Sequence, residues 1–308
     1  MRRTLGLLVA LLLALGLLAA RARDDDRTRD ALLAPVTAKP RPSTTTTTTT
    51  APTTTTAPPV TTTAPAGPVV AAADPDGLAT QLAAAIDGTR NPTTAEADLA
   101  RLGHTEQVVY LALLDRPEWQ QVVLAKLTPG QRGVAEANLR AGQELRLLAP
   151  TPKDKLPTGW VIEAPRPAAE LLGYYREAEA QFGIPWPYLA AINLVETRMG
   201  RIRGLSSAGA QGPMQFMPQT WARFGQGDVN NPRDAILAAA RYLQYNGAPQ
   251  TTDTAVWNYN RSWHYVNAVL AYADQMKADE RAFASYYHWQ VYYRTVNGSQ
   301  LLPVGWRG

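Results

Sequence analysis

The sequence predicts a mainly helical, all-α protein. Leu, Ala and Arg are abundant among its 308 residues, and β-branched runs are scarce outside one threonine tract. Beyond that tract, apolar residues recur at spacings of three and four, which is typical of amphipathic helices. An apolar fraction of 45% is ordinary for a globular protein, and the length allows two modest domains with tails. We therefore expect helices packed around a buried core.

Residues 1–22 have the features of an export signal. Two arginines precede an apolar run from Leu5 to Ala20, and an A-x-A cleavage site ends at Ala22. The run is shorter than the roughly 20 residues of a membrane-spanning helix, which favours cleavage over retention. An uncleaved membrane anchor is the alternative, because charged residues follow at once. Both interpretations predict a secreted or membrane-anchored, extracytoplasmic protein associated with the cell wall.

Composition divides the rest of the chain into segments. Residues 23–73 hold a Thr/Pro-rich tract that cannot bury a core, so we expect a disordered linker. Helical patterns in residues 74–150 predict a small helical domain of unknown role. Residues 151–167 are Pro-rich and predict a second linker. A further helical domain is expected at residues 168–281, followed by an aromatic tail at residues 282–308.

The composition also excludes several kinds of site. The chain has no cysteine, so disulfides, thiolate metal sites and cysteine nucleophiles are excluded. His104, His264 and His288 lie far apart and match no zinc-binding spacing, so we expect neither a metal nor a cofactor. The net charge is +4, but the basic residues are scattered, and this pattern predicts no nucleic-acid partner. An acidic envelope polymer or a solvated surface fits equally well.

One carboxyl group stands apart from all others. Glu196 is the only acidic residue between Ala180 and Gly227. A helix is expected to begin near Pro187 and to end at Gly200. At about 100° per residue, the glutamate shares one helix face with three apolar residues, Leu189, Ile192 and Met199. Burial would raise the pKa of this carboxyl group, as a general acid working near neutral pH requires.

Two interpretations of Glu196 remain open from the helix alone. The structural one is a surface ion pair with Arg198 or Arg201. The loop that follows favours a catalytic one, since Gly209 and Gly212 allow the backbone to approach a ligand closely. The same loop supplies uncharged polar and apolar side chains, namely Ser206, Gln215, Met214 and Phe216. Such a wall suits a polar, uncharged polymer such as a sugar chain.

These residues together resemble a known family. Glu196 and the stretch SSAGAQGPMQFMPQT resemble the E-S/T…S-x-x-G-A-x-G-L-M-Q-x-M-P-x-T signature of the soluble lytic transglycosylases, which are related to goose-type lysozyme. Tyr259 and Asn260 in AVWNYN look like the Tyr-Asn pair of the family's second block. The resemblance covers about a third of the chain. Pro213 stands where the family usually has leucine.

The resemblance implies a lysozyme-like catalytic domain that acts on peptidoglycan. The bond cleaved would be the β-1,4 bond between N-acetylmuramic acid and N-acetylglucosamine. Glu196 would protonate the glycosidic oxygen and then act as base toward the muramic acid C6 hydroxyl, which closes on C1 to give a 1,6-anhydro product. Because this nucleophile is intramolecular, one carboxyl group suffices where ordinary glycosidases need two.

The resemblance also implies substrate-binding roles for five residues, Ser206, Met214, Gln215, Tyr259 and Asn260. Ser206 would orient groups around the intermediate, and Tyr259 would hydrogen-bond near the glutamate. Met214 and Gln215 would line the subsite for the N-acetyl sugar. The alternative for Met214 is an apolar side chain that fills the core.

Two rival functions stay open at this point. A muramidase would hydrolyse the same bond and would need a water-activating carboxylate roughly 6.5–9.5 Å from the glutamate. The sequence candidates for that second group are Asp228, Asp234 and Asp253. A catalytically silent wall-binding module is the non-enzymatic rival, although an intact Glu196 argues against it. Protein partners are not predicted.

Overall fold

The computed structural model describes residues 68–308. The predicted export signal and nearly all of the Thr/Pro-rich linker lie outside the described residues. Val69–Gly308 fall into one unit of mutually contacting backbone. Within this part of the chain no helix is both long enough and apolar enough to cross a membrane.

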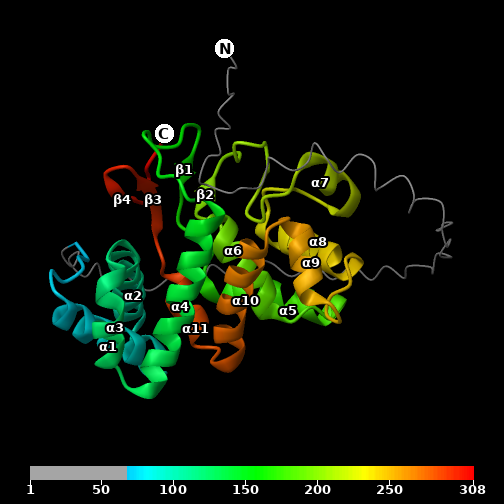
Figure 1. Ribbon diagram of the computed structural model, residues 1–308. Helices are drawn as coiled ribbons and strands as arrows, with labels where there is room; N and C mark the ends of the chain where they lie inside the picture. Colours follow the sequence, from blue (N-terminus) through cyan, green and yellow to red (C-terminus); the bar gives the residue numbers. More distant parts are fainter. Residues whose placement is uncertain (1–67) are drawn as a thin grey trace, which may run out of the picture. The chain divides into compact units, whose positions relative to one another are not determined.

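Helices dominate the described residues, which confirms the mainly helical prediction (Figure 1). The first four are α1 (Pro75–Arg90), α2 (Glu96–Asp115), α3 (Pro117–Ala125) and α4 (Pro129–Leu148). Asp74 caps α1 by accepting a hydrogen bond from the backbone N–H of Gly77. Thr128 and Gln131 form a capping box at the start of α4. Polar side chains therefore fix where these helices begin.

A proline divides what the sequence presents as one long helical pattern. Helix α2 ends at Asp115 and α3 begins at Pro117. The residue before a proline is sterically disfavoured in the helical conformation. Arg116 accordingly has φ −129° and ψ 72°. The break lets α3 turn back and pack against α1 and α4.

The remaining helices include one that is buried along most of its length. They are α5 (Ala168–Phe182), α6 (Trp186–Thr197), α7 (Pro218–Phe224), α8 (Pro232–Tyr245), α9 (Thr252–Tyr259), α10 (Trp263–Ala278) and α11 (Ala282–Tyr287). Helix α6 is buried along most of its length and packs against α5 and α10. Asn231 caps α8 by accepting hydrogen bonds from the N–H groups of Arg233 and Asp234, as its position before Pro232 predicts.

The N-terminal helices share a core with the rest of the described chain. Helix α4 packs along α10, and the two lie side by side in Figure 1. The buried carboxylate of Glu106 on α2 accepts hydrogen bonds from Tyr110 (3.0 Å) and from Ser285 on α11 (2.6 Å), and it pairs with Arg90 at 3.5 Å. The boundary that we predict between residues 74–150 and 168–281 is thus crossed by extensive packing, and it remains a prediction.

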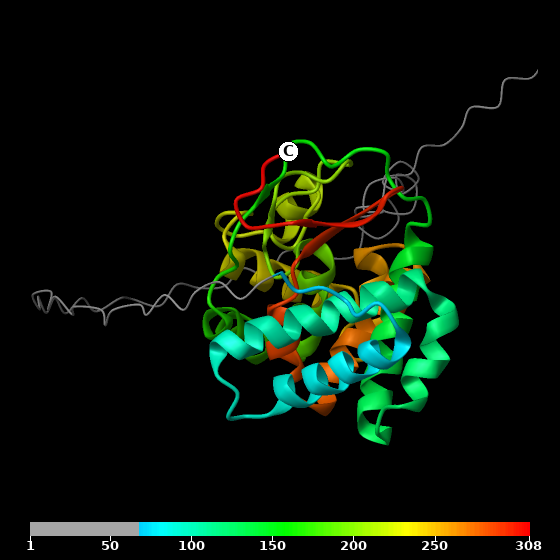
Figure 2. The same cartoon turned by 90° about the vertical axis from the view of Figure 1, so that its left-hand side faces the viewer.

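Two small antiparallel sheets add to the helices. Strand β1 (Val161–Ile162) pairs with β2 (Ile202–Arg203), and β3 (Val291–Thr295) pairs with β4 (Gly298–Leu302). Side chains from both sheets form a second apolar cluster with Trp160. The hairpin is drawn in red in Figure 2. The aromatic tail therefore packs on the fold through this cluster and through α11.

Candidate active site

Glu196 lies in the last turn of α6, on the face that the sequence predicts. Leu189 and Ile192 of α6 are buried, as is the glutamate itself, and Met199 is buried beyond the end of the helix. The helix ends three residues before Gly200, because Arg198 already has a left-handed backbone with φ 53°. Non-glycine residues seldom adopt positive φ, and such strain gathers at functional sites. The turn ends the helix one residue after the glutamate and directs the chain into β2.

The Glu196 carboxyl group is fully buried and has one hydrogen-bond donor. Tyr265 on α10 donates from its hydroxyl to Oε1 at 2.7 Å. The other oxygen, Oε2, has no partner within residues 68–308. Burial raises the pKa of Glu196 to about 8, against a smaller lowering by the Tyr265 hydrogen bond. The raised pKa favours the protonated form of this group at neutral pH.

The arginines near Glu196 have other partners. Arg198 donates to the carbonyl oxygen of Leu194 at 3.0 Å, and its guanidinium lies 5.9 Å from the Trp289 ring. Arg201 donates to the carbonyl oxygen of Tyr287 at 2.9 Å. The structure contradicts the interpretation of Glu196 as a surface ion pair, since the carboxyl group is buried and neither arginine reaches it.

The loop after α6 is fastened to that helix through the carbonyl oxygen of Pro213. Asn193 Nδ2 donates to this oxygen at 2.8 Å, and Thr197 Oγ1 donates at 2.6 Å. Tyr175 in turn donates to Asn193 Oδ1 at 2.7 Å. The anchor uses a backbone carbonyl, which every residue type provides. The proline in place of the family's leucine therefore keeps this contact.

Ser206 and Gln215 organise the loop from within. Ser206 Oγ accepts hydrogen bonds from the backbone N–H groups of Ala208 (3.3 Å) and Ala210 (3.0 Å). Gln215 has φ 50° and donates from its side-chain amide to the carbonyl oxygen of Gly212 at 2.9 Å. Both side chains are buried, so the structure places them as supports of the loop's shape.

Tyr259 on α9 hydrogen-bonds to the backbone of Met214 in the loop after α6. Tyr259 donates to the carbonyl oxygen of Met214 at 2.7 Å rather than to Glu196. Burial raises the pKa of Tyr259 well above its usual value, and the nearby charge of Glu196 adds to the shift. The Met214 side chain is fully buried in the main apolar core. Asn260 is buried, and its Nδ2 lacks a partner within the described residues.

Tyr265 is not among the site residues predicted from the sequence, although it makes the only hydrogen bond to Glu196 within the described residues. A signal is present in the sequence, since Tyr265 lies four residues before Val269 on the inner face of α10. A buried tyrosine places its hydroxyl against a polar partner. The pattern predicts that such a partner exists, but the partner lies 69 positions away in the chain and only the fold identifies it.

The three aspartates considered for a second carboxylate hold local turns. Asp228 accepts from the N–H of Asn230, and Asp253 accepts from the N–H of Thr254. Asp234 accepts from the N–H of Asp228. The raised pKa of Glu196 arises from burial and is opposed only by Tyr265, with no contribution from another carboxyl group of the described chain. Burial is thus the main cause of the raised pKa of Glu196.

Replacing Tyr265 with Phe is expected to raise the pKa of Glu196 further. The hydroxyl hydrogen bond lowers this pKa in the wild type, so its loss favours the protonated form. The alkaline limit of any activity that needs protonated Glu196 should then move to higher pH. A pH–rate profile measures the shift, and an unchanged limit would show that the hydrogen bond does not act on the carboxyl group.

Replacing Gly212 with Ala is expected to lower the free energy of unfolding by about 1–3 kcal/mol more than replacing Gly209 with Ala. Both glycines have positive φ, 72° and 85°. A Cβ at Gly212 would lie 1.9 Å from the carbonyl oxygen of Val229, whereas one at Gly209 meets nothing within 4 Å. Urea unfolding of the two variants measures the difference, and equal losses would mean that the loop does not pack as described.

Comparison with known proteins agrees with this geometry. Residues 173–289 match the family model of the Transglycosylase SLT domain. The chain is similar to a membrane-bound lytic murein transglycosylase F of Thiobacillus denitrificans (strain ATCC 25259 / T1), with 37% identity over 85 residues. The match covers 28% of this chain and 18% of that relative, so it spans less than a fifth of the relative's length. No solved structure gives a significant match. The segment that matches the Transglycosylase SLT domain includes the buried glutamate of α6.

Proposed function

We propose that this protein is a peptidoglycan lytic transglycosylase that cleaves the β-1,4 bond between N-acetylmuramic acid and N-acetylglucosamine. The observation that carries the proposal is the state of Glu196. Burial raises its pKa to about 8, and no second carboxyl group of residues 68–308 acts on it. A lone, protonated acid fits a reaction in which the substrate provides its own nucleophile. The family match and the name of the relative support the same activity.

In the proposed reaction, Glu196 donates one proton and later accepts one. Glu196 donates its proton to the glycosidic oxygen as the bond to C1 breaks, and the carboxylate that results accepts the proton of the C6 hydroxyl. That hydroxyl oxygen closes on C1 and gives the 1,6-anhydro end, so no water is consumed. The hydrogen bond from Tyr265 to Oε1 stabilises the carboxylate between the two transfers.

Further groups around Glu196 are proposed to form the sugar subsites. They are Ser206, Met214, Gln215, Tyr259 and Asn260. Their backbone and side chains shape the loop and the end of α9 beside the glutamate. Because the Glu196 side chain has no exposed surface, contact with a glycan strand requires that neighbouring side chains move. Residues 168–281 are proposed as the catalytic domain.

Export is part of the proposal. Residues 1–22 are proposed to direct the chain out of the cytoplasm, and residues 23–73 to carry the folded part into the wall. N-terminal sequencing of the protein recovered from the cell envelope tests this. A mature chain that begins after Ala22 supports cleavage of the signal. A chain that begins at Met1 and is found in the membrane fraction supports an uncleaved anchor. Recovery of the protein from the cytoplasm alone contradicts export.

The one-carboxylate proposal is tested against a two-carboxylate hydrolase by replacing two of the three candidate aspartates, Asp228 and Asp253. The full chain and its Asp228→Asn and Asp253→Asn variants are incubated with purified peptidoglycan, and the release of soluble fragments is followed. We expect both variants to release fragments at the wild-type rate. Loss of about 10²-fold or more in either folded variant would identify a second catalytic carboxylate and contradict the proposal.

A further inference from the structure

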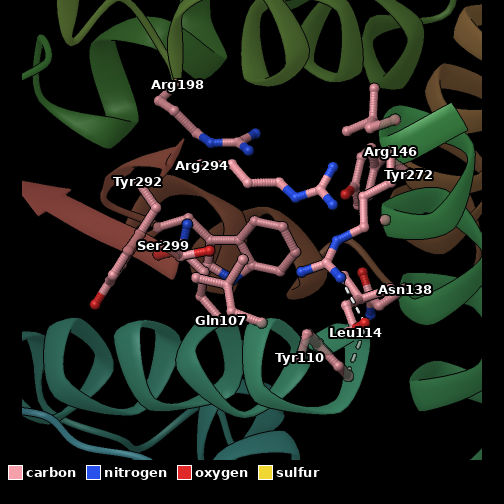
Figure 3. A pocket seen from close by; sticks show the side chains of 14 residues that line it. Gln107, Tyr110, Leu114, Asn138, Arg146, Arg198, Tyr272, Tyr292, Arg294 and Ser299 are labelled. Atoms are coloured by element: carbon pink, nitrogen blue, oxygen red, sulfur yellow. Dashed lines mark hydrogen bonds between the residues drawn. The ribbon is translucent and has the colours of Figure 1, made fainter. Parts of the chain in front are cut away.

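A cavity whose lining does not include Glu196 contains several arginines. It has a volume of about 130 Å³, is partly open to solvent and is lined by residues of α2, α4, α10, the end of α6 and the β3–β4 hairpin. Figure 3 shows Arg146, Arg198 and Arg294 reaching into the same space from different parts of the fold. The proposed reaction uses none of these groups, so the cavity is a feature that the activity does not explain.

The cavity carries a surplus of positive charge. Arg146 pairs with Asp115 at 2.6 Å and is thereby neutralised. Within residues 68–308, Arg198 and Arg294 form no salt bridge. Arg198 donates to the carbonyl oxygen of Leu194 at 3.0 Å, and Arg294 donates to the carbonyl oxygen of Pro150 at 3.1 Å. Burial lowers the pKa of Arg294, repulsion from Arg146 lowers it further, and the nearby Asp115 opposes the shift. Three guanidinium groups therefore line the cavity, and Asp115 is the carboxylate that acts on two of them.

The lining also holds an unused hydrogen-bond donor. Trp289 is 4% exposed, and its Nε1 has no acceptor among the described residues. A buried donor without an acceptor costs about 1–3 kcal/mol, so such groups normally have a partner. Ser299 and Gln107 also line the cavity, and the side-chain amide of Gln107 is already bonded to the backbone of Gln290. The free donor of Trp289 thus belongs to a cavity lining with excess positive charge.

The size of the cavity limits what it can hold. A cavity near 150 Å³ accommodates a benzene-sized molecule. This one is slightly smaller and too small for a glycan strand, but it has room for a compact ion. The surplus of two positive charges matches a doubly charged ion, and guanidinium groups bind the oxygen atoms of phosphate with favourable geometry.

We propose that this arginine cavity binds a doubly charged oxyanion of the phosphate class, either as a free ion or as a phosphate group on a small ester. The ion accepts hydrogen bonds from Arg198, Arg294 and Trp289 Nε1. It also bridges the N-terminal helices, the end of α6 and the C-terminal hairpin, which otherwise meet here across like charges. Because Arg198 follows Glu196 by two residues, the bound ion also fixes the backbone next to the candidate acid.

Isothermal titration of the full chain with inorganic phosphate at constant ionic strength tests the proposal. Arg294→Gln is expected to weaken binding at least about tenfold, since it removes a charge-assisted hydrogen bond. Arg294→Lys keeps the charge and should lose less. The matched control is Arg176→Gln, which removes an exposed arginine of α5 that does not line the cavity. Unfolding midpoints of all variants verify that each is folded.

The outcomes separate the proposal from general attraction to a basic protein. Phosphate that binds the wild type and Arg176→Gln alike, but Arg294→Gln weakly, supports the site. Stronger binding of glycerol 3-phosphate than of phosphate assigns it to an ester, and the reverse order assigns it to the free ion. The proposal is overturned if phosphate does not bind or if all variants bind it equally. It is also overturned if Arg294→Gln and Arg294→Lys lose the same affinity, or if acetate binds as strongly as phosphate.

Discussion

Replacing Glu196 with Gln is expected to lower the rate of peptidoglycan cleavage by about 10²–10⁴-fold, which is the usual contribution of a general acid or base. The amide has nearly the same shape as the carboxyl group, and its oxygen can still accept the hydrogen bond from Tyr265. It cannot donate a proton to the glycosidic oxygen or take one from the C6 hydroxyl. Binding of glycan strands should therefore persist, which a sedimentation assay with insoluble peptidoglycan measures.

The control for this substitution is Glu118→Gln. Glu118 is an exposed glutamate of α3, so the exchange makes the same chemical change far from the α6 site in the chain. Wild-type activity is expected for this variant. If Glu196→Gln cleaved peptidoglycan at the wild-type rate, Glu196 would not be required for the reaction.

The same substitution is expected to change how stability depends on pH. The pKa of Glu196 is about 8 in the folded protein, against 4.5 for a solvent-exposed glutamate. A group with a raised folded pKa contributes stability that is fully present below the unfolded pKa and is lost as pH rises through the folded pKa. Between pH 5 and pH 8, the free energy of unfolding of the wild type should therefore fall by about 3–4 kcal/mol relative to that of Glu196→Gln, because the amide does not titrate.

Urea unfolding at pH 5 and pH 8 measures this difference. As pH rises, the free energy of unfolding of Glu196→Gln should increase relative to that of the wild type. The free energy of unfolding of Glu118→Gln should change with pH as that of the wild type does. Parallel behaviour of the wild type and Glu196→Gln across this range would mean that Glu196 ionises normally. The raised pKa, and with it the physical basis for a general acid at neutral pH, would then be wrong.

Local signals in the sequence predict much of this architecture. The apolar sequence of α6 predicts that Glu196 is buried, and the helix is in fact buried on nearly every side. Asn231 and Pro232 mark the start of α8, because a cap depends on residues adjacent in the chain. Pro117 also marks a helix boundary by local sterics, although the apolar spacing around it continues as in one element.

The contacts of the site depend on parts of the chain that are distant in sequence. Tyr265 reaches Glu196 from α10, and Tyr259 reaches the carbonyl oxygen of Met214 from α9. No periodicity encodes which hydroxyl meets which acceptor. The sequence likewise does not predict the left-handed turn at Arg198, because an arginine does not by itself favour positive φ. The β3–β4 hairpin is stabilised by packing against Trp160, which a count of helical spacings overlooks.

The chemical identity of the products tests the central claim most directly. The full chain is incubated with peptidoglycan, and the released fragments are weighed by mass spectrometry and assayed for reducing ends, with Glu196→Gln as the inactive control. A single protonated glutamate that uses the substrate's C6 hydroxyl predicts fragments lighter by one water than hydrolysis products, without a reducing end. Fragments that carry a reducing end and the full mass would show that water attacks, and the one-carboxylate transglycosylase account would be contradicted.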